Sequence, residues 1–173
     1  MLTMLFGGSA SGKSSYAEAL CCAHGGRKFY IAAMMPYGDE GARRIQRHRE
    51  LRAGKGFETI ERYTDLSGLM LPARGTALIE CLCNLTANEM FDESGAAKDC
   101  IEAVIEGVRQ IEGQCEHLYV VTNDIASDGH IYDDATMAYI RALGEINRQL
   151  AQRADSVIEV CCGIPISIKG EIE

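Results

Sequence analysis

Residues 7–14 read Gly7-Gly8-Ser9-Ala10-Ser11-Gly12-Lys13-Ser14 and match the pattern G-x-x-x-x-G-K-[ST]. An apolar run, Leu2–Phe6, precedes this stretch, and a helical pattern, Lys13–Ala23, follows it. In that setting the backbone N–H groups of the glycine turn and of the helix start can hold a polyphosphate. We expect Lys13 to reach the β- and γ-phosphates and the Ser14 hydroxyl to serve Mg²⁺. The alternative, a glycine turn that contains a lysine by chance, does not account for the flanking elements.

On both sides of this loop, short apolar runs alternate with longer amphipathic stretches. Strands are predicted over Leu2–Phe6, Lys28–Ala33, Phe57–Glu61, Ala77–Ile79, Leu118–Thr122, Ser156–Val160 and Ile166–Lys169, and helices over Lys13–Ala23, Asp39–Ala53, Leu82–Phe91, Ala96–Gly113 and Asp134–Arg153. This alternation is typical of a mostly parallel sheet with helices on both faces. With the phosphate loop it predicts an α/β fold of the P-loop NTPase (RecA-like) type in three layers. No linker interrupts the chain, so we expect residues 1–173 to form a single nucleotide-binding domain.

Composition excludes several classes of protein. Of the 173 residues, 47% are apolar and 24% are charged, which is ordinary for a folded globular chain. The net charge is −8, and a broad nucleic-acid surface needs a basic protein. No apolar run approaches the ~20 residues of a membrane span, and residues 1–8 lack the basic start of a signal peptide. We therefore expect a cytoplasmic protein that binds neither nucleic acid nor membrane.

The eight cysteines do not form a metal or disulfide pattern. They are Cys21, Cys22, Cys81, Cys83, Cys100, Cys115, Cys161 and Cys162, with no C-x-x-C and no zinc-like pairing with histidine. In a cytoplasmic chain we interpret them as reduced thiols that serve as small buried hydrophobes.

A nucleotide site also needs an acid near the phosphates to hold the metal or its waters. The run Thr76-Ala77-Leu78-Ile79-Glu80 places a carboxylate at the end of a predicted strand, where open α/β sheets bind ligands. Asp124, which follows another predicted strand, is the competing candidate. We favour Glu80, although either acid could instead cap a helix or lie solvated in a loop.

Five arginines fall within ten residues of the second predicted helix: Arg43, Arg44, Arg47, Arg49 and Arg52. Arg44, His48 and Arg52 follow at intervals of four residues and therefore share one helical face. Guanidinium groups match phosphate oxygens, and a neutral imidazole between them is a competent nucleophile toward phosphorus. The alternative is a solvated helix with weak ion pairs, and composition alone favours that alternative.

The motifs together resemble the family of bifunctional adenosylcobinamide kinases / adenosylcobinamide-phosphate guanylyltransferases of cobalamin assembly. The similar features span Gly7 to about Lys169. They are the phosphate loop, Tyr30-Ile31-Ala32, Arg44-Ile45-Gln46-Arg47-His48-Arg49-Glu50-Leu51-Arg52, Glu61, Glu80-Cys81-Leu82, Val121-Thr122-Asn123-Asp124, and the C-terminal Gly144, Asn147 and Asp155. The arginine–histidine helix at this distance from the loop is the more specific of these signals.

The resemblance implies two reactions with a nucleotide and a corrinoid. The kinase step would transfer a γ-phosphoryl group from ATP or GTP to the substrate hydroxyl. In the second step His48 would attack the α-phosphorus of GTP, and the GMP would pass to adenosylcobinamide phosphate. The implied catalytic residues are His48 and Lys13, the implied metal ligands for Mg²⁺ are Ser14 and Glu80, and the implied nucleotide contacts are Gly7, Gly8, Ser9, Ala10, Ser11, Gly12, Lys13, Ser14, Ala33, Met34, Met35, Arg49, Glu50, Leu51, Arg52, Glu61 and Glu80. Members of the family form homotrimers.

The chain departs from the family pattern at a few positions. Ala10 stands where an arginine is usual, Cys83 replaces a threonine, and Asp124 replaces a glutamate. Residues 126–132 lack the family's G-x-G-I-V-P sequence. Two alternatives therefore stay open: a P-loop kinase without guanylyltransferase activity, and a non-catalytic GTP-binding paralogue.

Overall fold

The structure, a computed structural model, describes residues 1–36, 38–125 and 129–171; the side chains of residues 39, 40, 42, 44, 48 and 51 lie outside that description. The strands are β1 (Leu2–Phe6), β2 (Lys28–Ala32), β3 (Phe57–Glu61), β4 (Thr76–Ile79), β5 (His117–Val121), β6 (Ser156–Cys161) and β7 (Ile164–Lys169). The helices are α1 (Lys13–Ala23), α2 (Gly38–Arg52), α3 (Leu82–Phe91), α4 (Cys100–Gln114) and α5 (Asp134–Arg153), with short 3-10 turns η1 (Leu66–Gly68) and η2 (Ala97–Asp99).

The strands form one sheet in the order β3-β2-β4-β5-β1-β6-β7. Every neighbouring pair is parallel except β6 and β7, which are antiparallel. The prediction of a mostly parallel sheet is therefore confirmed. Strand β1 lies between β5 and β6, so the loop that follows it opens at the carboxyl edge of the sheet, where α/β folds bind ligands.

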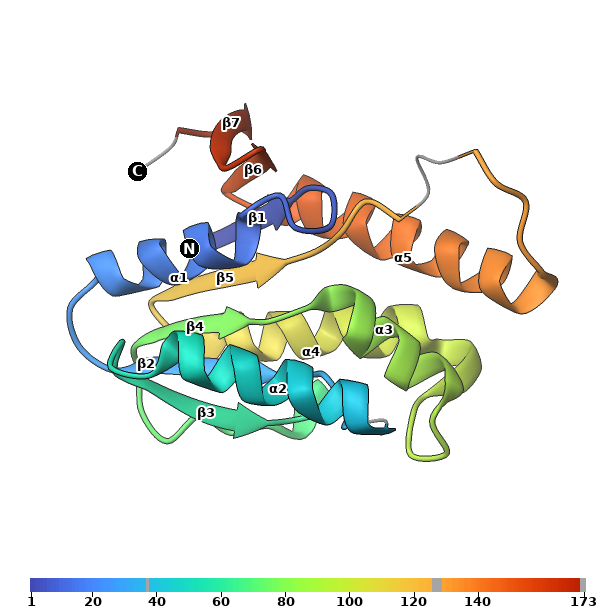
Figure 1. The fold of residues 1–173 in the computed structure, drawn as a ribbon, viewed down its shortest axis with the longest axis horizontal. Coiled ribbons are helices and arrows are strands. Elements are labelled where there is room, and N and C mark those ends of the chain that lie inside the picture. The colour runs from blue at the N-terminus through green and yellow to red at the C-terminus, as the bar shows by residue number, and fades with distance from the viewer. Residues whose placement is uncertain (37, 126–128, 172–173) are drawn as a thin grey trace.

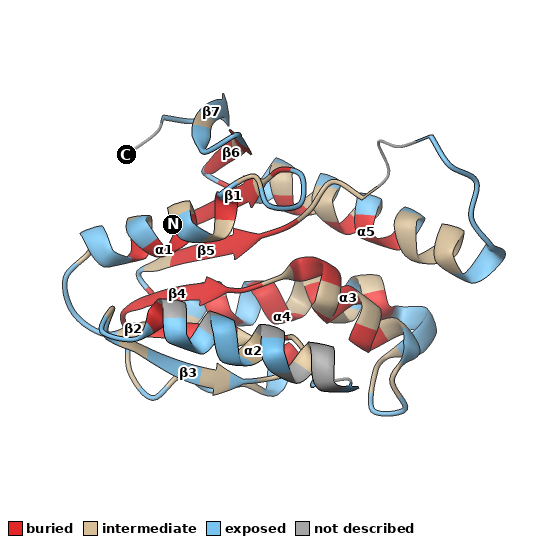
Figure 2. Cartoon of the chain, viewed as in Figure 1, coloured by how far each residue is buried: buried red, intermediate tan, exposed pale blue. Residues whose placement is uncertain are grey.

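Helices cover both faces of the sheet (Figure 1). Alternate residues of the strands point to opposite faces, as the period of two requires. Leu2 and Met4 pack with apolar side chains of α3, α4 and α5, whereas Leu5 packs with Ala17 and Cys21 of α1. The middle strands are buried, while α2 and β3 are largely exposed (Figure 2). The predicted three-layer arrangement is confirmed.

The predicted elements differ from the observed ones mainly near the C-terminus. The sequence predicts that the last strand begins at Ile166, after a turn, but Ile164 and Pro165 already belong to β7. Proline is tolerated there because β7 is an edge strand. The turn consists instead of Cys162 and Gly163, whose φ angles are 52° and 80°. The helix predicted over Ala96–Gly113 is divided into η2 and α4.

The expectation that the cysteines are buried is wrong for three of them. All eight are free thiols, and Cys22, Cys161 and Cys162 are exposed while Cys81 is half-buried. Cys161 and Cys162 are exposed because β6 runs on into the tight turn at the edge of the sheet. In the described part of the chain, no helix is both long and apolar enough to cross a membrane.

Candidate active site: a phosphate loop beside an arginine pocket

The phosphate loop is shaped by two glycines that no other residue could replace without strain. A side chain on Gly7 would place its Cβ 2.6 Å from the carbonyl oxygen of Val160 in β6. Gly12 has a φ of 94°, caps α1, and lies so close to Gly163 that an added Cβ would be 3.2 Å from its Cα. Both positions bring backbone close to backbone, which is the use of glycine in such loops. The loop therefore fits tightly between β1 and the β6–β7 turn.

Backbone hydrogen bonds hold the loop on two sides. The Gly163 N–H donates to the Ser11 carbonyl at 2.8 Å, and the Asp124 N–H donates to the Gly7 carbonyl at 3.2 Å. The Ser11 hydroxyl is buried and has no hydrogen-bond partner among the described residues. A buried donor of this kind is suited to a phosphate oxygen.

The side chain of Lys13 contacts the phosphate loop. Its side chain is only 6% exposed, and its ammonium group donates to the Gly8 carbonyl at 2.8 Å. Burial lowers the pKa of Lys13, whereas the nearby sulfurs of Cys81 and Cys83 raise it. A buried ammonium with weak local partners favours an anionic ligand.

Glu80 and Asp124 both lie near the carboxyl ends of the central strands, as predicted. Glu80 is 8% exposed and directly follows β4, where its N–H donates to the Ile31 carbonyl. Asp124 is half-buried and is anchored to the loop through its N–H. The Ser14 hydroxyl and these carboxylates are hard oxygen donors, the type that Mg²⁺ prefers, so the donor set fits the metal. The choice between the two acids stays a prediction.

A second cationic centre lies beside α2. Arg52 is 6% exposed, and its guanidinium carbon lies 3.5 Å from the centre of the Tyr30 ring. Its Nε and Nη1 atoms are buried without hydrogen-bond partners among the described residues. Arg52 lines a small cavity of about 10 Å³, here called the arginine pocket, together with Ala32, Met34, Ile45, Arg49, Thr59, Glu61, Tyr63 and Glu80. A buried guanidinium with unused donors is suited to an anion such as phosphate.

Three polar side chains close one wall of this pocket. Arg49 forms an ion pair with Glu61, and the Tyr63 hydroxyl donates to the other Glu61 oxygen at 3.0 Å. Burial raises the pKa of Tyr63, and the hydrogen bond to the Glu61 carboxylate raises it further. Arg49 and Glu61, both predicted nucleotide contacts, are therefore bonded to each other.

A comparison with known families agrees with this arrangement. The family model described as cobinamide kinase / cobinamide phosphate guanyltransferase matches residues 3–168. The chain belongs to this family. Curated relatives of the cobinamide kinase / guanyltransferase family include the bifunctional adenosylcobalamin biosynthesis proteins CobU of Escherichia coli (30% identical) and CobU of Salmonella typhimurium (29% identical), each matched over 98% of this chain and 100% of the relative. CobP of Pseudomonas aeruginosa is 26% identical over 99% of both chains.

A solved structure supports the fold. It is an ATPase domain that aligns with a TM-score of 0.53 at 12% sequence identity, covering 91% of this chain and 68% of that domain. At this identity the likeness concerns the fold, and it agrees with the predicted P-loop NTPase architecture of this cobinamide kinase / guanyltransferase family member.

The remaining predicted site residues are placed as follows in this family member. Met34 lines the arginine pocket, while Ala33 is fully buried and its carbonyl accepts from Asn88. Glu50 is exposed and accepts a hydrogen bond from Gln46 on the outside of α2. His48, Arg44 and Leu51 belong to α2, but the structure does not describe their side chains. Their roles, like those of the other site residues, stay predictions.

Sequence reasoning assigned no role to several residues that shape the site. Tyr30, Tyr63 and Asn88 hold the arginine pocket or its rim, and Asn123 donates to the sulfurs of Cys81 and Cys83 at 3.7 and 3.4 Å. The sequence does mark Tyr30, because it is an aromatic residue in the strand that leads to the predicted nucleotide contacts at residues 33–35. The positions of the others depend on tertiary packing, which no local pattern marks.

Proposed function

We propose that this chain is a bifunctional enzyme of cobalamin biosynthesis that phosphorylates adenosylcobinamide and then attaches GMP to the product. The observation that carries the proposal is the position of Glu80–Cys83 between two cationic centres. Glu80 lines the arginine pocket, while the sulfurs of Cys81 and Cys83 lie near the buried Lys13 ammonium. One short segment therefore adjoins both the phosphate loop and the pocket of Arg52, and these two groups of cationic side chains are available to the two proposed phosphate transfers.

In the proposed kinase step, the substrate hydroxyl oxygen bonds to the γ-phosphorus of ATP or GTP while the bond to the bridging oxygen breaks. The hydroxyl proton leaves to solvent, and the nucleoside diphosphate is released. Lys13 and the loop N–H groups stabilise the charge on the phosphate oxygens, since positioning and charge neutralisation carry such reactions. Ser14 and Glu80 are the residues proposed to hold Mg²⁺, which when bound neutralises further phosphate charge.

In the proposed guanylyl transfer, an imidazole nitrogen of His48 bonds to the α-phosphorus of GTP and pyrophosphate leaves. A phosphate oxygen of adenosylcobinamide phosphate then displaces the nitrogen, which gives adenosylcobinamide-GDP. Arg49 and Arg52 are proposed to hold the nucleotide phosphates during both displacements, because guanidinium forks match phosphate oxygens. The homotrimer and the cytoplasmic location stay predictions.

Product analysis tests the proposal. The purified protein is incubated with adenosylcobinamide, Mg²⁺ and ATP, then with GTP, and the corrinoid products are separated. We expect the phosphorylated corrinoid in the first reaction and the GDP derivative in the second. Lys13→Ala should reduce phosphorylation by about 10²-fold or more, while the control Arg43→Ala, at an exposed position of α2, should not. Phosphorylated product without the GDP derivative would indicate a kinase only, and neither product would contradict the proposal.

A further inference from the structure

Two cysteines with one residue between them meet beside the phosphate loop. Cys81 is the last residue before α3, and Cys83 lies in the first turn of that helix. The two side chains are hydrogen-bonded to each other. The Asn123 amide donates to both sulfurs, at 3.7 Å to Cys81 and at 3.4 Å to Cys83. These two thiols, here called the dithiol, share one donor and contact each other, and neither proposed reaction uses them.

Backbone contacts hold the dithiol in place. The Tyr139 hydroxyl of α5 donates to the Cys83 carbonyl at 3.1 Å. The Cys81 carbonyl accepts from the Leu85 N–H at 3.2 Å, in the hydrogen bond that begins α3. Both main-chain segments that carry the sulfurs are therefore fixed by bonds that do not involve the sulfurs themselves.

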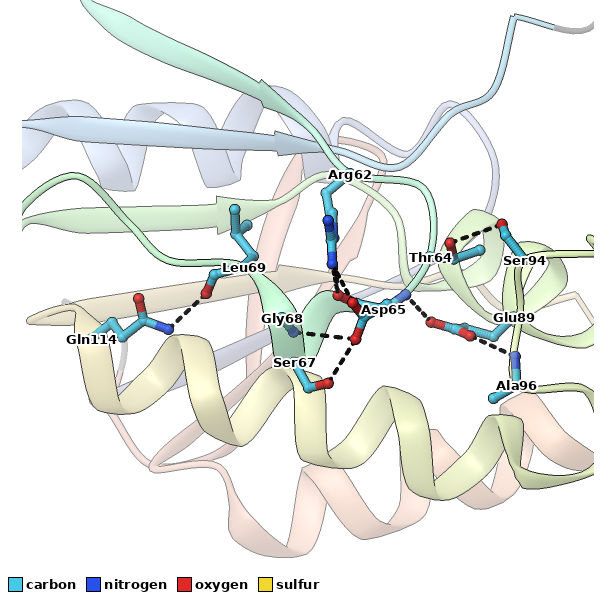
Figure 3. Close-up of polar contacts among 10 residues, drawn as sticks. All are labelled: Arg62, Thr64, Asp65, Ser67, Gly68, Leu69, Glu89, Ser94, Ala96 and Gln114. Atoms are coloured by element: carbon cyan, nitrogen blue, oxygen red, sulfur yellow. Dashed lines mark hydrogen bonds and ion pairs between the residues drawn. The ribbon is translucent and has the colours of Figure 1, made fainter.

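A buried carboxylate anchors the other end of α3. Glu89 is 2% exposed; its Oε1 accepts from the Asp65 N–H at 2.6 Å, and its Oε2 accepts from the Ala96 N–H at 2.9 Å (Figure 3). Both oxygens of this acid thus hold the backbone of other segments, which fixes the position of the helix. The first turn, with Cys83, keeps its place as a result.

The dithiol adjoins the ammonium group of the phosphate loop. Burial lowers the pKa of Lys13 and both sulfurs oppose this effect, so the sulfurs lie within electrostatic range of the ammonium. Cys83 is 7% exposed, whereas Cys81 is half-buried. Solvent therefore reaches one member of the pair, and a reagent close to water in size can approach it.

Cys83 is the more reactive of the two sulfurs. Hydrogen bonds from the Cys81 thiol and from the Asn123 amide lower the pKa of Cys83, although its burial opposes them. The thiolate is the nucleophilic form of cysteine. A reactive sulfur with a second thiol in contact is the arrangement by which oxidation stops at a reversible disulfide.

We propose that Cys81 and Cys83 form an oxidation site, at which a hydroperoxide closes a disulfide beside the phosphate loop. The Cys83 sulfur bonds to one peroxide oxygen as the oxygen–oxygen bond breaks, and the other oxygen leaves with the Cys83 proton as water or an alcohol. The Cys81 sulfur then bonds to the Cys83 sulfur, the sulfur–oxygen bond breaks, and the hydroxyl leaves with the Cys81 proton as water. Two thiols are oxidised and one peroxide is reduced.

This site goes beyond the proposed function and does not depend on it. Threonine is usual at position 83 in the family pattern, so the dithiol belongs to this chain and not to the family motif. A nucleotide whose phosphates contact Lys13 would cover the dithiol. Because thiol reactions depend on access, bound GTP should slow the oxidation.

Oxidation of the folded protein by hydrogen peroxide tests the proposal. After a timed exposure the protein is unfolded, its remaining thiols are alkylated, and the tryptic peptide of residues 75–98, which contains both cysteines, is identified by mass spectrometry. We expect this peptide to lose two hydrogen atoms and to take up no alkylating group. Dithiothreitol should restore both thiols. Saturating GTP with Mg²⁺ should slow the reaction by about threefold or more.

Two variants and a matched control locate the chemistry. In Cys81→Ser, oxidation of Cys83 should stop at the sulfenic acid, which dimedone traps. In Asn123→Ala, the sulfurs lose the donor that they share, and the disulfide should form about threefold more slowly or less. The control Gln110→Ala removes an exposed side-chain amide of α4 and should react as the unmodified protein does. Circular dichroism checks each fold, and a misfolded Asn123→Ala leaves Cys81→Ser to decide.

Three results would overturn the proposal. The first is full alkylation of both thiols in the 75–98 peptide at a peroxide concentration that oxidises the exposed Cys161 and Cys162. The second is an equal rate of disulfide formation in folded Asn123→Ala and in the unmodified protein. The third is an equal rate with and without saturating GTP. Failure of the proposed function reads out differently, as absence of the corrinoid products with the thiol measurements unchanged.

Discussion

The guanidinium carbon of Arg52, the last residue of α2, lies 3.5 Å from the centre of the Tyr30 ring in β2. Both side chains are buried, with exposures of 6% and 1%. Burial raises the pKa of Tyr30, and the Glu80 carboxylate, to which its hydroxyl is hydrogen-bonded, raises it further. Tyr30 therefore contacts one proposed phosphate ligand with its ring and the proposed metal ligand with its hydroxyl.

The ring of Tyr30 should matter more for nucleotide binding than its hydroxyl. A stacked guanidinium gains about 1–2 kcal/mol when desolvated. We expect Tyr30→Leu to weaken GTP binding about tenfold, because Arg52 loses its support, and Tyr30→Phe to change it only a few-fold. Fluorescent GTP titration measures both affinities, and thermal unfolding checks that each variant is folded. Equal effects of the two substitutions would argue against a role for the stack.

The two adjacent glycines of the loop should respond differently to alanine. At Gly7 an added Cβ meets the Val160 carbonyl at 2.6 Å, whereas at Gly8 nothing lies within 4 Å. We expect Gly7→Ala to lower the free energy of unfolding by about 1–3 kcal/mol, since backbone must shift to admit the methyl group. Gly8→Ala should stay within about 0.5 kcal/mol of the unmodified protein. Urea unfolding measures both values, and a reversed order would contradict the loop geometry.

Thiol labelling should separate the cysteines by exposure. In the folded protein Cys22, Cys161 and Cys162 are exposed, while Cys21, Cys83, Cys100 and Cys115 are buried. We expect a maleimide to modify the three exposed thiols quickly and the four buried ones only after unfolding. Mass spectrometry of the digested protein assigns the sites. Rapid modification of Cys100 or Cys115 would show that the packing around α4 is different.

The stability of the protein should depend on pH through Cys83. Hydrogen bonds from the Cys81 thiol and the Asn123 amide lower the pKa of Cys83 from 9.0 to about 6, despite its burial. Cys81 stays protonated because its pKa is raised well above 9.0. Between pH 9.0 and a pH of about 6, the Cys83 thiol keeps its proton in the unfolded chain but has lost it in the folded protein. The free energy of unfolding should therefore rise with pH by up to about 1.4 kcal/mol per unit.

The matching control is Cys83→Ser, which cannot ionise in this range. The stabilisation from Cys83 is complete above the unfolded pKa of 9.0 and is lost as the pH falls toward 6. We expect the rise in stability across this range to become shallower in the variant, as measured by urea unfolding at a series of pH values. An identical pH profile in both proteins would mean that Cys83 is an ordinary thiol.

Much of the fold could be predicted because its signals are local. The bounds of β1, α1, α3 and α5 agree with the predicted ranges, since an apolar strand, a glycine turn or a long amphipathic pattern marks each. The phosphate loop could also be predicted, because its whole motif lies in eight consecutive residues. By contrast, the start of β7 at Ile164 and Pro165 was missed, because tolerance of proline depends on the place of β7 at the sheet edge.

The candidate site was predicted less completely than the fold. The arginine-rich helix was found from its spacing, but the Arg49–Glu61 pair and the Arg52–Tyr30 stack depend on how α2 lies against β2 and β3. No sequence pattern indicated a structural role for Glu89. In the sequence it is one acid in a helix, and its role in joining Asp65 and Ala96 comes from tertiary structure.

We propose that catalysis passes through a covalent nucleotide intermediate on His48 of α2, the helix that also carries Arg49 and Arg52. The direct measurement is incubation with α-labelled GTP and Mg²⁺, followed by denaturation and counting of the label on the protein. We predict stable labelling of the unmodified protein and of Arg43→Ala, and none of His48→Ala. Labelling that persists in His48→Ala, or its absence from an unmodified protein that binds GTP, would contradict the claim.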